Sequence, residues 1–336
     1  MWTRRAGPSG LESPHRPARA DAKARMTSQP YLVRLTARLA DGLARLPEAR
    51  RRRHAVYLRA AQNPDGGFSG REGDSDLYYT GFALRSLAVL GDLTPDVCTR
   101  TAGFLRASLT RHAGVIDFFS LLYTCVLVEL FGGEKVLDTA TPDWRDRVAA
   151  TLETFRTADG GYAKTAGGPA GSTYHSFLVG LCYQLLGREV PDAPSLARFV
   201  LSRRREDGGF VEIGPMKRSG TNPTAAAVGA LQIVAPAELD EPGLRQGLID
   251  FLAEMASDEG GLRANGRVPL ADLLSTFTGA WTLAELGAGD RLDPYEVRAY
   301  VAAAERGQGG FHGGLWDTGH DVEYTFYGLG VLGLFS

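Results

Sequence analysis

One short phrase, two glycines followed by an aromatic or leucine residue, recurs along this chain at nearly constant spacing. It stands at Asp65-Gly66-Gly67-Phe68, Asp159-Gly160-Gly161-Tyr162, Asp207-Gly208-Gly209-Phe210, Glu259-Gly260-Gly261-Leu262 and Gln308-Gly309-Gly310-Phe311. The copies lie roughly 48 residues apart, and a gap of double length holds a worn copy near Gly114. This period is typical of a helical repeat protein, and it predicts six units.

Each unit has the pattern of two helices joined by a glycine turn. A segment with one charged face, such as residues 197–204, precedes the two glycines, which permit the positive φ that ends a helix. About ten residues later a second segment begins that is apolar on nearly every face, as in residues 225–231. Because helices that are apolar all round are buried, the second helices form an inner layer and the first helices an outer one.

The last unit ends in the apolar residues 330–336, with no polar cap. Since open solenoids need polar caps at both ends, we predict an all-α fold in which six helix hairpins close into an (α/α)6 barrel. We expect this single barrel domain to span residues 31–336. Residues 1–30 are predicted to be a disordered tail, because their start is rich in Arg, Pro, Gly and Ser, and Met26 is an alternative start.

Composition excludes several classes of protein. A net charge of −2 gives no basic field, so we expect no nucleic-acid partner. The three dispersed cysteines argue against a disulfide framework and are typical of a cytoplasmic protein. We expect no run of the ~18 apolar residues that a bilayer span needs, and therefore no transmembrane segment.

Four inner helices are predicted to begin at an aspartate: Asp76, Asp117, Asp272 and Asp321. One interpretation is that these residues only cap helices, because aspartate is a preferred N-cap. The other interpretation is catalytic. Carboxylates around one mouth repel each other, which raises the pKa values of some of them. An acid that stays protonated beside an apolar cavity can protonate an alkene. Both interpretations stay open.

Closure of the ring predicts a binding funnel. Six inner helices point their N-termini, with free N–H groups and partial positive charge, at the same rim. A polar rim above an apolar floor suits a hydrophobic small-molecule substrate with an anionic head, such as a prenyl diphosphate.

His175 lies inside the third inner helix, either as a core histidine or as a general base or hydrogen-bond donor to the substrate head. Inward-facing aromatic rings would stabilise a carbocation. The predicted substrate-binding residues are Tyr78, Tyr79, Phe119, Tyr174, Trp281, Glu323, Tyr324 and Arg267.

The glycine turns and helix starts such as Asp76-Leu77-Tyr78-Tyr79-Thr80 resemble the prenyltransferase and squalene-cyclase repeat family. The resemblance covers about residues 57–336, and the order of repeats is most similar to that of protein prenyltransferase β subunits. It implies the α/α barrel and an enzyme that acts on a prenyl or polyene chain.

Both catalytic signatures of that family are altered here. The resemblance implies a zinc bound by an Asp-x-Cys pair and a histidine, but the matching positions hold Asp272, Leu274 and Tyr324. Leucine cannot bind a metal, so we expect no metal and no cofactor. The changed positions also argue against a protein prenyltransferase β subunit, so we expect no partner α subunit. The Asp-x-Asp-Asp motif of class II terpene cyclases is also missing.

Our leading hypothesis is therefore a zinc-independent enzyme that cyclises or transfers a prenyl or polyene chain, in specialised metabolism of a bacterium. His175 and Asp272 would perform acid–base steps, with Asp76 or Asp321 as partner acids. The alternatives are a non-catalytic barrel that binds a lipid or peptide, and a divergent protein prenyltransferase β subunit.

Overall fold

The computed structural model describes residues 29–109, 114–137 and 142–336. The expected tail therefore falls almost wholly outside the described residues.

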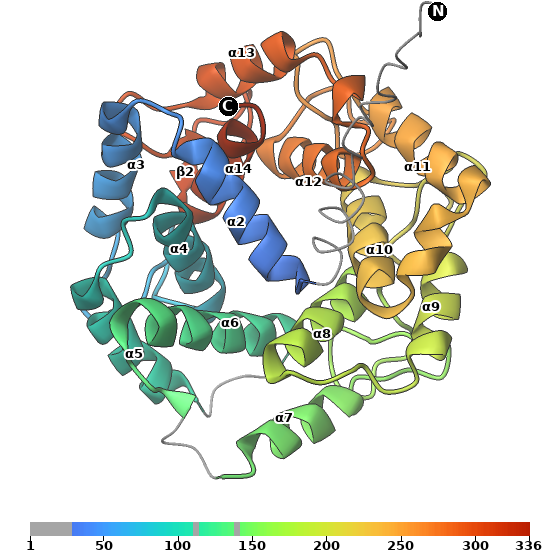
Figure 1. The fold of residues 1–336 in the computed structure, drawn as a ribbon, viewed down its shortest axis with the longest axis horizontal. Helices are drawn as coiled ribbons and strands as arrows, with labels where there is room; N and C mark the ends of the chain where they lie inside the picture. Colours follow the sequence, from blue (N-terminus) through green and yellow to red (C-terminus); the bar gives the residue numbers. More distant parts are fainter. Residues whose placement is uncertain (1–28, 110–113, 138–141) are drawn as a thin grey trace, which may run out of the picture.

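Two concentric layers of helices form a closed ring (Figure 1). The inner helices are α4 (Leu77–Leu90), α6 (Val115–Gly132), α8 (Thr173–Leu186), α10 (Thr221–Val234), α12 (Leu273–Glu285) and α14 (Val322–Leu334). The outer helices are α3 (Glu48–Ala60), α5 (Pro95–Ser108), α7 (Trp144–Glu153), α9 (Ala193–Leu201), α11 (Pro242–Glu254) and α13 (Pro294–Ala304). Because α14 packs against both α12 and α4, the last unit joins the first, and the predicted (α/α)6 barrel is confirmed.

Short elements complete the connections between the helices. Two 3-10 helices, η2 (Pro236–Asp240) and η3 (Gly289–Arg291), lie between inner and outer helices. The strands β1 (Phe311–His312) and β2 (His320–Asp321) pair antiparallel just before α14.

The recurring glycine phrase works as a turn held in place by the next helix. Its first glycine has a positive φ in each copy, for example +88° at Gly66, where a side chain would be strained. The aromatic residue that follows is fully buried, and the backbone N–H of Phe68 donates to the Thr80 hydroxyl at 2.9 Å. The same bond joins Phe210 to Thr224. A threonine or serine hydroxyl near the start of α4, α8, α10 and α12 therefore anchors the turn before the helix.

One helix lies outside the repeats. α2 (Tyr31–Leu43) crosses the middle of the ring (Figure 1) and contacts the C-terminal ends of the inner helices. Its Arg34 forms a salt bridge of 2.7 Å with Glu285 at the end of α12, and the Tyr31 backbone N–H donates to the side chain of Gln184 in α8. This helix closes one end of the ring and makes a floor.

The expectation of no long apolar run was wrong for α6. By length and composition alone, Val115–Gly132 is apolar enough to cross a membrane. However, 61% of this segment is buried inside the protein, where α6 packs against α4, α5 and α8. A helix in the core of a barrel can be as long and as apolar as a membrane-spanning helix, because it is apolar on every face.

Candidate functional site

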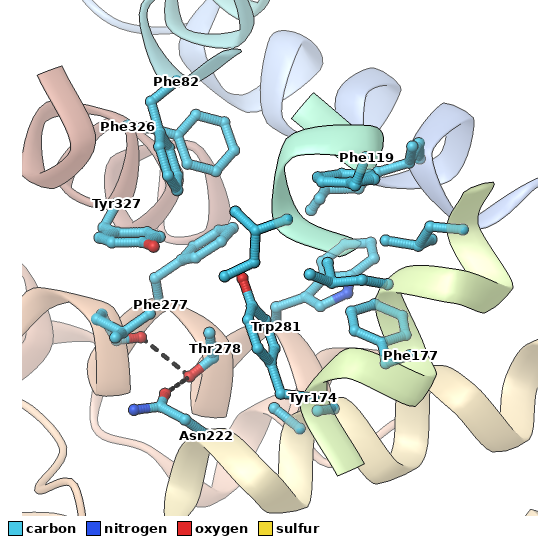
Figure 2. A pocket seen from close by; sticks show the side chains of 18 of the residues that line it. Phe82, Phe119, Tyr174, Phe177, Asn222, Phe277, Thr278, Trp281, Phe326 and Tyr327 are labelled. Carbon is cyan, nitrogen blue, oxygen red and sulfur yellow. Dashed lines mark hydrogen bonds between the residues drawn. The ribbon is translucent and has the colours of Figure 1, made fainter. Parts of the chain in front are cut away.

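A cavity of about 490 Å³ lies between the floor helix α2 and the inner helices. Its volume is within the range of small-molecule sites. Aromatic rings dominate the wall, and Figure 2 shows Phe82, Phe326, Tyr327 and Phe277 on one side of the space, with Phe119 and Phe177 on the other. The cavity is thus a mainly apolar chamber.

The predicted residues divide into two groups. Tyr78, Phe119, Tyr174, Trp281 and His175 line the cavity. The remaining predicted residues do not line it: Asp76, Asp272, Asp321, Tyr79, Glu323, Tyr324 and Arg267.

The three aspartates cap the inner helices. Asp76, Asp272 and Asp321 accept backbone N–H bonds of 2.7–2.8 Å from the residues three positions later in α4, α12 and α14. Burial raises the pKa of Asp76 and of Asp272 above the ordinary value, in the direction expected for rim acids. These caps use N–H groups that we expected to be free for a diphosphate.

Three other predicted residues are held away from the cavity. The Tyr79 ring packs against Gly70, and the Tyr324 ring lies 5.5 Å from the guanidinium of Arg71. Arg71 in turn forms a 3.0 Å salt bridge with Asp321. Arg267 is exposed in the loop before α12.

Glu323 lies directly behind the cavity wall. The hydroxyl groups of Tyr78 and Tyr327, which both line the cavity, donate to its carboxylate at 2.6 Å and 3.1 Å. Burial raises the pKa of Glu323 above its usual range. The carboxyl group is therefore one hydrogen bond away from two hydroxyl groups of the cavity wall.

Ser172 and Glu212 fix the orientation of His175. The Ser172 hydroxyl has one proton, and it donates that proton to the Glu212 carboxylate. At 2.7 Å from the same oxygen, the Nδ1 atom of His175 must therefore be the donor. Nε2 then has the lone pair, and no protein hydrogen bond reaches it within the described ranges.

The imidazole is also neutral near pH 7. Burial, followed by the charge of Lys164, lowers the pKa of His175 to about 4. A neutral imidazole with an unpaired Nε2 has the protonation state of a general base.

The positions that would hold zinc do not fit this metal. The Asp272 carboxylate accepts hydrogen bonds from the backbone N–H and the hydroxyl of Ser275. Leu274 is part of the apolar cavity wall. Within the described part of the chain, no three His, Cys, Asp or Glu residues gather as a metal-binding group.

Sequence reasoning missed Arg85, which lines the cavity from the middle of α4. A signal was present, because Arg85 is the one charged residue in the apolar segment 77–90. Its guanidinium carbon lies 4.0 Å from the centre of the Phe82 ring and 4.8 Å from that of Phe326.

Sequence comparison identifies one family. The family model described as the prenyltransferase alpha-alpha toroid domain matches residues 13–211, 118–262 and 216–336. No curated protein sequence matches the chain.

Solved structures with the same fold differ in chemistry. Protein geranylgeranyltransferase-I from Candida albicans, complexed with GGPP, has a TM-score of 0.69 at 15% identity, over 84% of this chain and 90% of that one. A variant of the type II terpene cyclase MstE from Scytonema, with geranylgeranyl dihydroxybenzoate bound, has a TM-score of 0.58 at 12% identity, over 90% and 98%. An alpha-1,6-mannanase from Salegentibacter scores 0.59 at 11% identity, over 85% and 98%. Identity this low shows the shared fold alone.

Proposed function

Since this chain belongs to the prenyltransferase alpha-alpha toroid family, we propose that it is a zinc-independent enzyme that binds a prenyl or polyene chain in its central cavity and cyclises or transfers it. The observation that carries the proposal is the aromatic chamber of about 490 Å³, closed below by α2. Two of the structural neighbours are described with GGPP and with a geranylgeranyl compound bound. We keep the cytoplasm as the expected location.

In this proposal the residues around the chamber have distinct roles. His175 is the general base, because its Nε2 is unprotonated. Glu323 is the acid, since its raised pKa favours the protonated form. The Tyr78 hydroxyl gives its own proton to the substrate as its oxygen accepts the proton of Glu323. Asp76 and Asp321 fix the starts of α4 and α14, which bear Tyr78 and Glu323, and Asp272 fixes the start of α12. The aromatic rings exclude water and hold the hydrocarbon.

Binding of a prenyl chain is expected to change the fluorescence of Trp281, which lies in the cavity wall. Titrating the protein with geranylgeranyl diphosphate and with geranylgeraniol should give a saturable change in emission. Trp281→Phe should remove most of that change. Trp316→Phe is the matched control, because Trp316 is 55% exposed and lies outside the cavity lining. No saturable change with either probe would contradict the proposed function.

If a probe turns over, Glu323→Gln and His175→Ala are each expected to lower the rate about 10²–10⁴-fold, the usual contribution of a general acid or base. Because the pKa of Glu323 is raised, its protonated form persists above the ordinary range of a carboxyl group, and activity should fall as pH rises through that pKa. Product formation is measured by chromatography across a pH series. Wild-type rates in both variants would remove the proposed roles.

Two further outcomes would support the alternative functions considered for this chain. A prenyl ligand that binds without any turnover would favour a non-catalytic binding barrel. One equivalent of zinc in the purified protein would favour a divergent protein prenyltransferase β subunit.

A further inference from the structure

Arg85 presents a positive charge to the cavity. Burial raises the pKa of Glu323 and the charge of Arg85 lowers it, but the two residues form no salt bridge in the described part of the chain. It lines the chamber, and its Nε donates to the backbone carbonyl of Gly81 at 3.0 Å. Within the described ranges it forms no salt bridge and no other hydrogen bond. Its terminal NH₂ groups therefore have donors to spare.

Aromatic rings surround this guanidinium. Its central carbon lies 4.0 Å from the Phe82 ring centre and 4.8 Å from that of Phe326, with Tyr123 and Phe119 at 5.8 Å and 5.9 Å. Such rings stabilise a cation through their quadrupole, but they accept no strong hydrogen bonds from the NH₂ groups. A partly buried cation whose donors have no protein partner is stabilised when an anion joins it.

The charges around the cavity also indicate where an anion would bind. An aspartate or serine cap already accepts one N-terminal N–H group in each of α4, α8, α12 and α14. Glu212 and Glu323 lie beside the first turns of α8 and α14. Among the described cavity-lining residues, Arg85 is the only cation, and it stands two turns inside α4. An anion inside the chamber would therefore meet its cation at Arg85.

We propose that Arg85 binds the acid group of the ligand inside the chamber, below the rim, and that the substrate is therefore a hydrophobic chain that carries a carboxylate or phosphate. This inference rests on the proposed function for the hydrocarbon part of the ligand. A planar guanidinium offers two parallel N–H bonds to either acid group. The aromatic rings around it hold the adjoining carbon chain.

Three probes with the same hydrocarbon test the proposal: geranylgeraniol, geranylgeranoic acid and geranylgeranyl diphosphate. Wild-type protein is expected to bind one or both acids at least about tenfold more tightly than the alcohol, since bonds between charged groups are strong. Arg85→Met should bring that ratio close to one, because it removes the charge that binds the acids. Arg85→Lys, which keeps the charge but loses the planar fork, should give an intermediate ratio.

Arg198→Met is the matched control, because Arg198 is exposed on the outer helix α9 and should leave the ratio unchanged. The acid that shows the larger preference identifies the acid group as carboxylate or phosphate. Equal binding of all three probes to wild type would overturn this inference alone. Failure of all three to bind would overturn the proposed function as well.

Thermal unfolding of the ligand-free protein gives an independent readout. If Arg85 serves a ligand, Arg85→Met removes a partly buried charge that forms no salt bridge, and Tm should stay level or rise by a few degrees. A fall in Tm of several degrees would show that Arg85 supports the packing of the ring, and it would overturn the proposal whatever ligand is used.

Discussion

Replacing Glu305 by glutamine is expected to lower the free energy of unfolding by about 3 kcal/mol, the loss typical of a broken buried ion pair. Glu305 directly follows α13, and its side chain is 7% exposed. It accepts hydrogen bonds from Arg50, Arg53 and His54, all on α3. A neutral amide would leave two guanidinium groups without their counter-charge.

The position of this cluster explains the size of the effect. α3 belongs to the first unit and α13 to the last, so Glu305 joins the two ends of the ring. His54 extends the connection, because its Nδ1 accepts the backbone N–H of Gly310 at 3.1 Å while its Nε2 faces Glu305 at 3.0 Å. The bond from Gly310 fixes the proton on Nε2, which therefore donates to the carboxylate.

The same carboxylate predicts how stability depends on pH. Burial alone would raise the pKa of Glu305, but hydrogen bonds from His54 and Arg50 outweigh it and lower the pKa to about 2. The group's contribution is therefore complete above its ordinary pKa of 4.5 and is lost as pH falls from there towards 2. Urea unfolding at a series of pH values should show wild type and Glu305→Gln converging at the acid end.

Asp41→Asn is the control for this experiment. Asp41 pairs with Arg45 at the surface, with both side chains more than half exposed, and such pairs contribute about 0–1 kcal/mol. Equal stability losses in the two variants at pH 7 would show that ring closure does not depend on Glu305.

Two local rules made the ring predictable from sequence. A repeated pair of glycines needs a turn with positive φ, and Gly66 and Gly160 have it, at +88° and +90°. Segments that are apolar on every face must be inner helices. Neither rule applies to α2, which belongs to no repeat. Its single stripe of Leu32, Leu35, Leu39 and Leu43 predicts an amphipathic helix but not the surface against which it packs.

The same all-round hydrophobicity limits prediction of the site. Neighbouring residues on a helix point about 100° apart, so Tyr78 lines the cavity while Tyr79 packs against Gly70. In a helix buried on every side, the pattern cannot show which side faces the cavity. Charged residues in such helices, such as Arg85 and Glu323, are a stronger indication of a functional site, because charged side chains are rarely buried without a partner.

Replacing Gly42 by alanine is expected to destabilise the protein by about 2–3 kcal/mol, because the added methyl group has no room. A Cβ atom at Gly42 would lie 1.8 Å from the carbonyl oxygen of Gly333 and 2.6 Å from its carbonyl carbon. Both atoms belong to the backbone of α14, so relief requires that a whole helix moves. Thermal or urea unfolding measures the loss.

The control for Gly42→Ala is the same substitution at Gly103, inside the outer helix α5, where a Cβ atom would meet nothing within 4 Å. There alanine should stabilise the protein by about 0.5–1 kcal/mol through helix propensity. Both substitutions replace a helical glycine by alanine, so stability changes of opposite sign would be due to the contact between α2 and α14.

That contact also positions Tyr31, whose hydroxyl accepts a 2.8 Å bond from the cavity residue Trp281. Gly42→Ala should therefore weaken prenyl binding as well, and unchanged stability and binding would show that α2 is not the floor of the site.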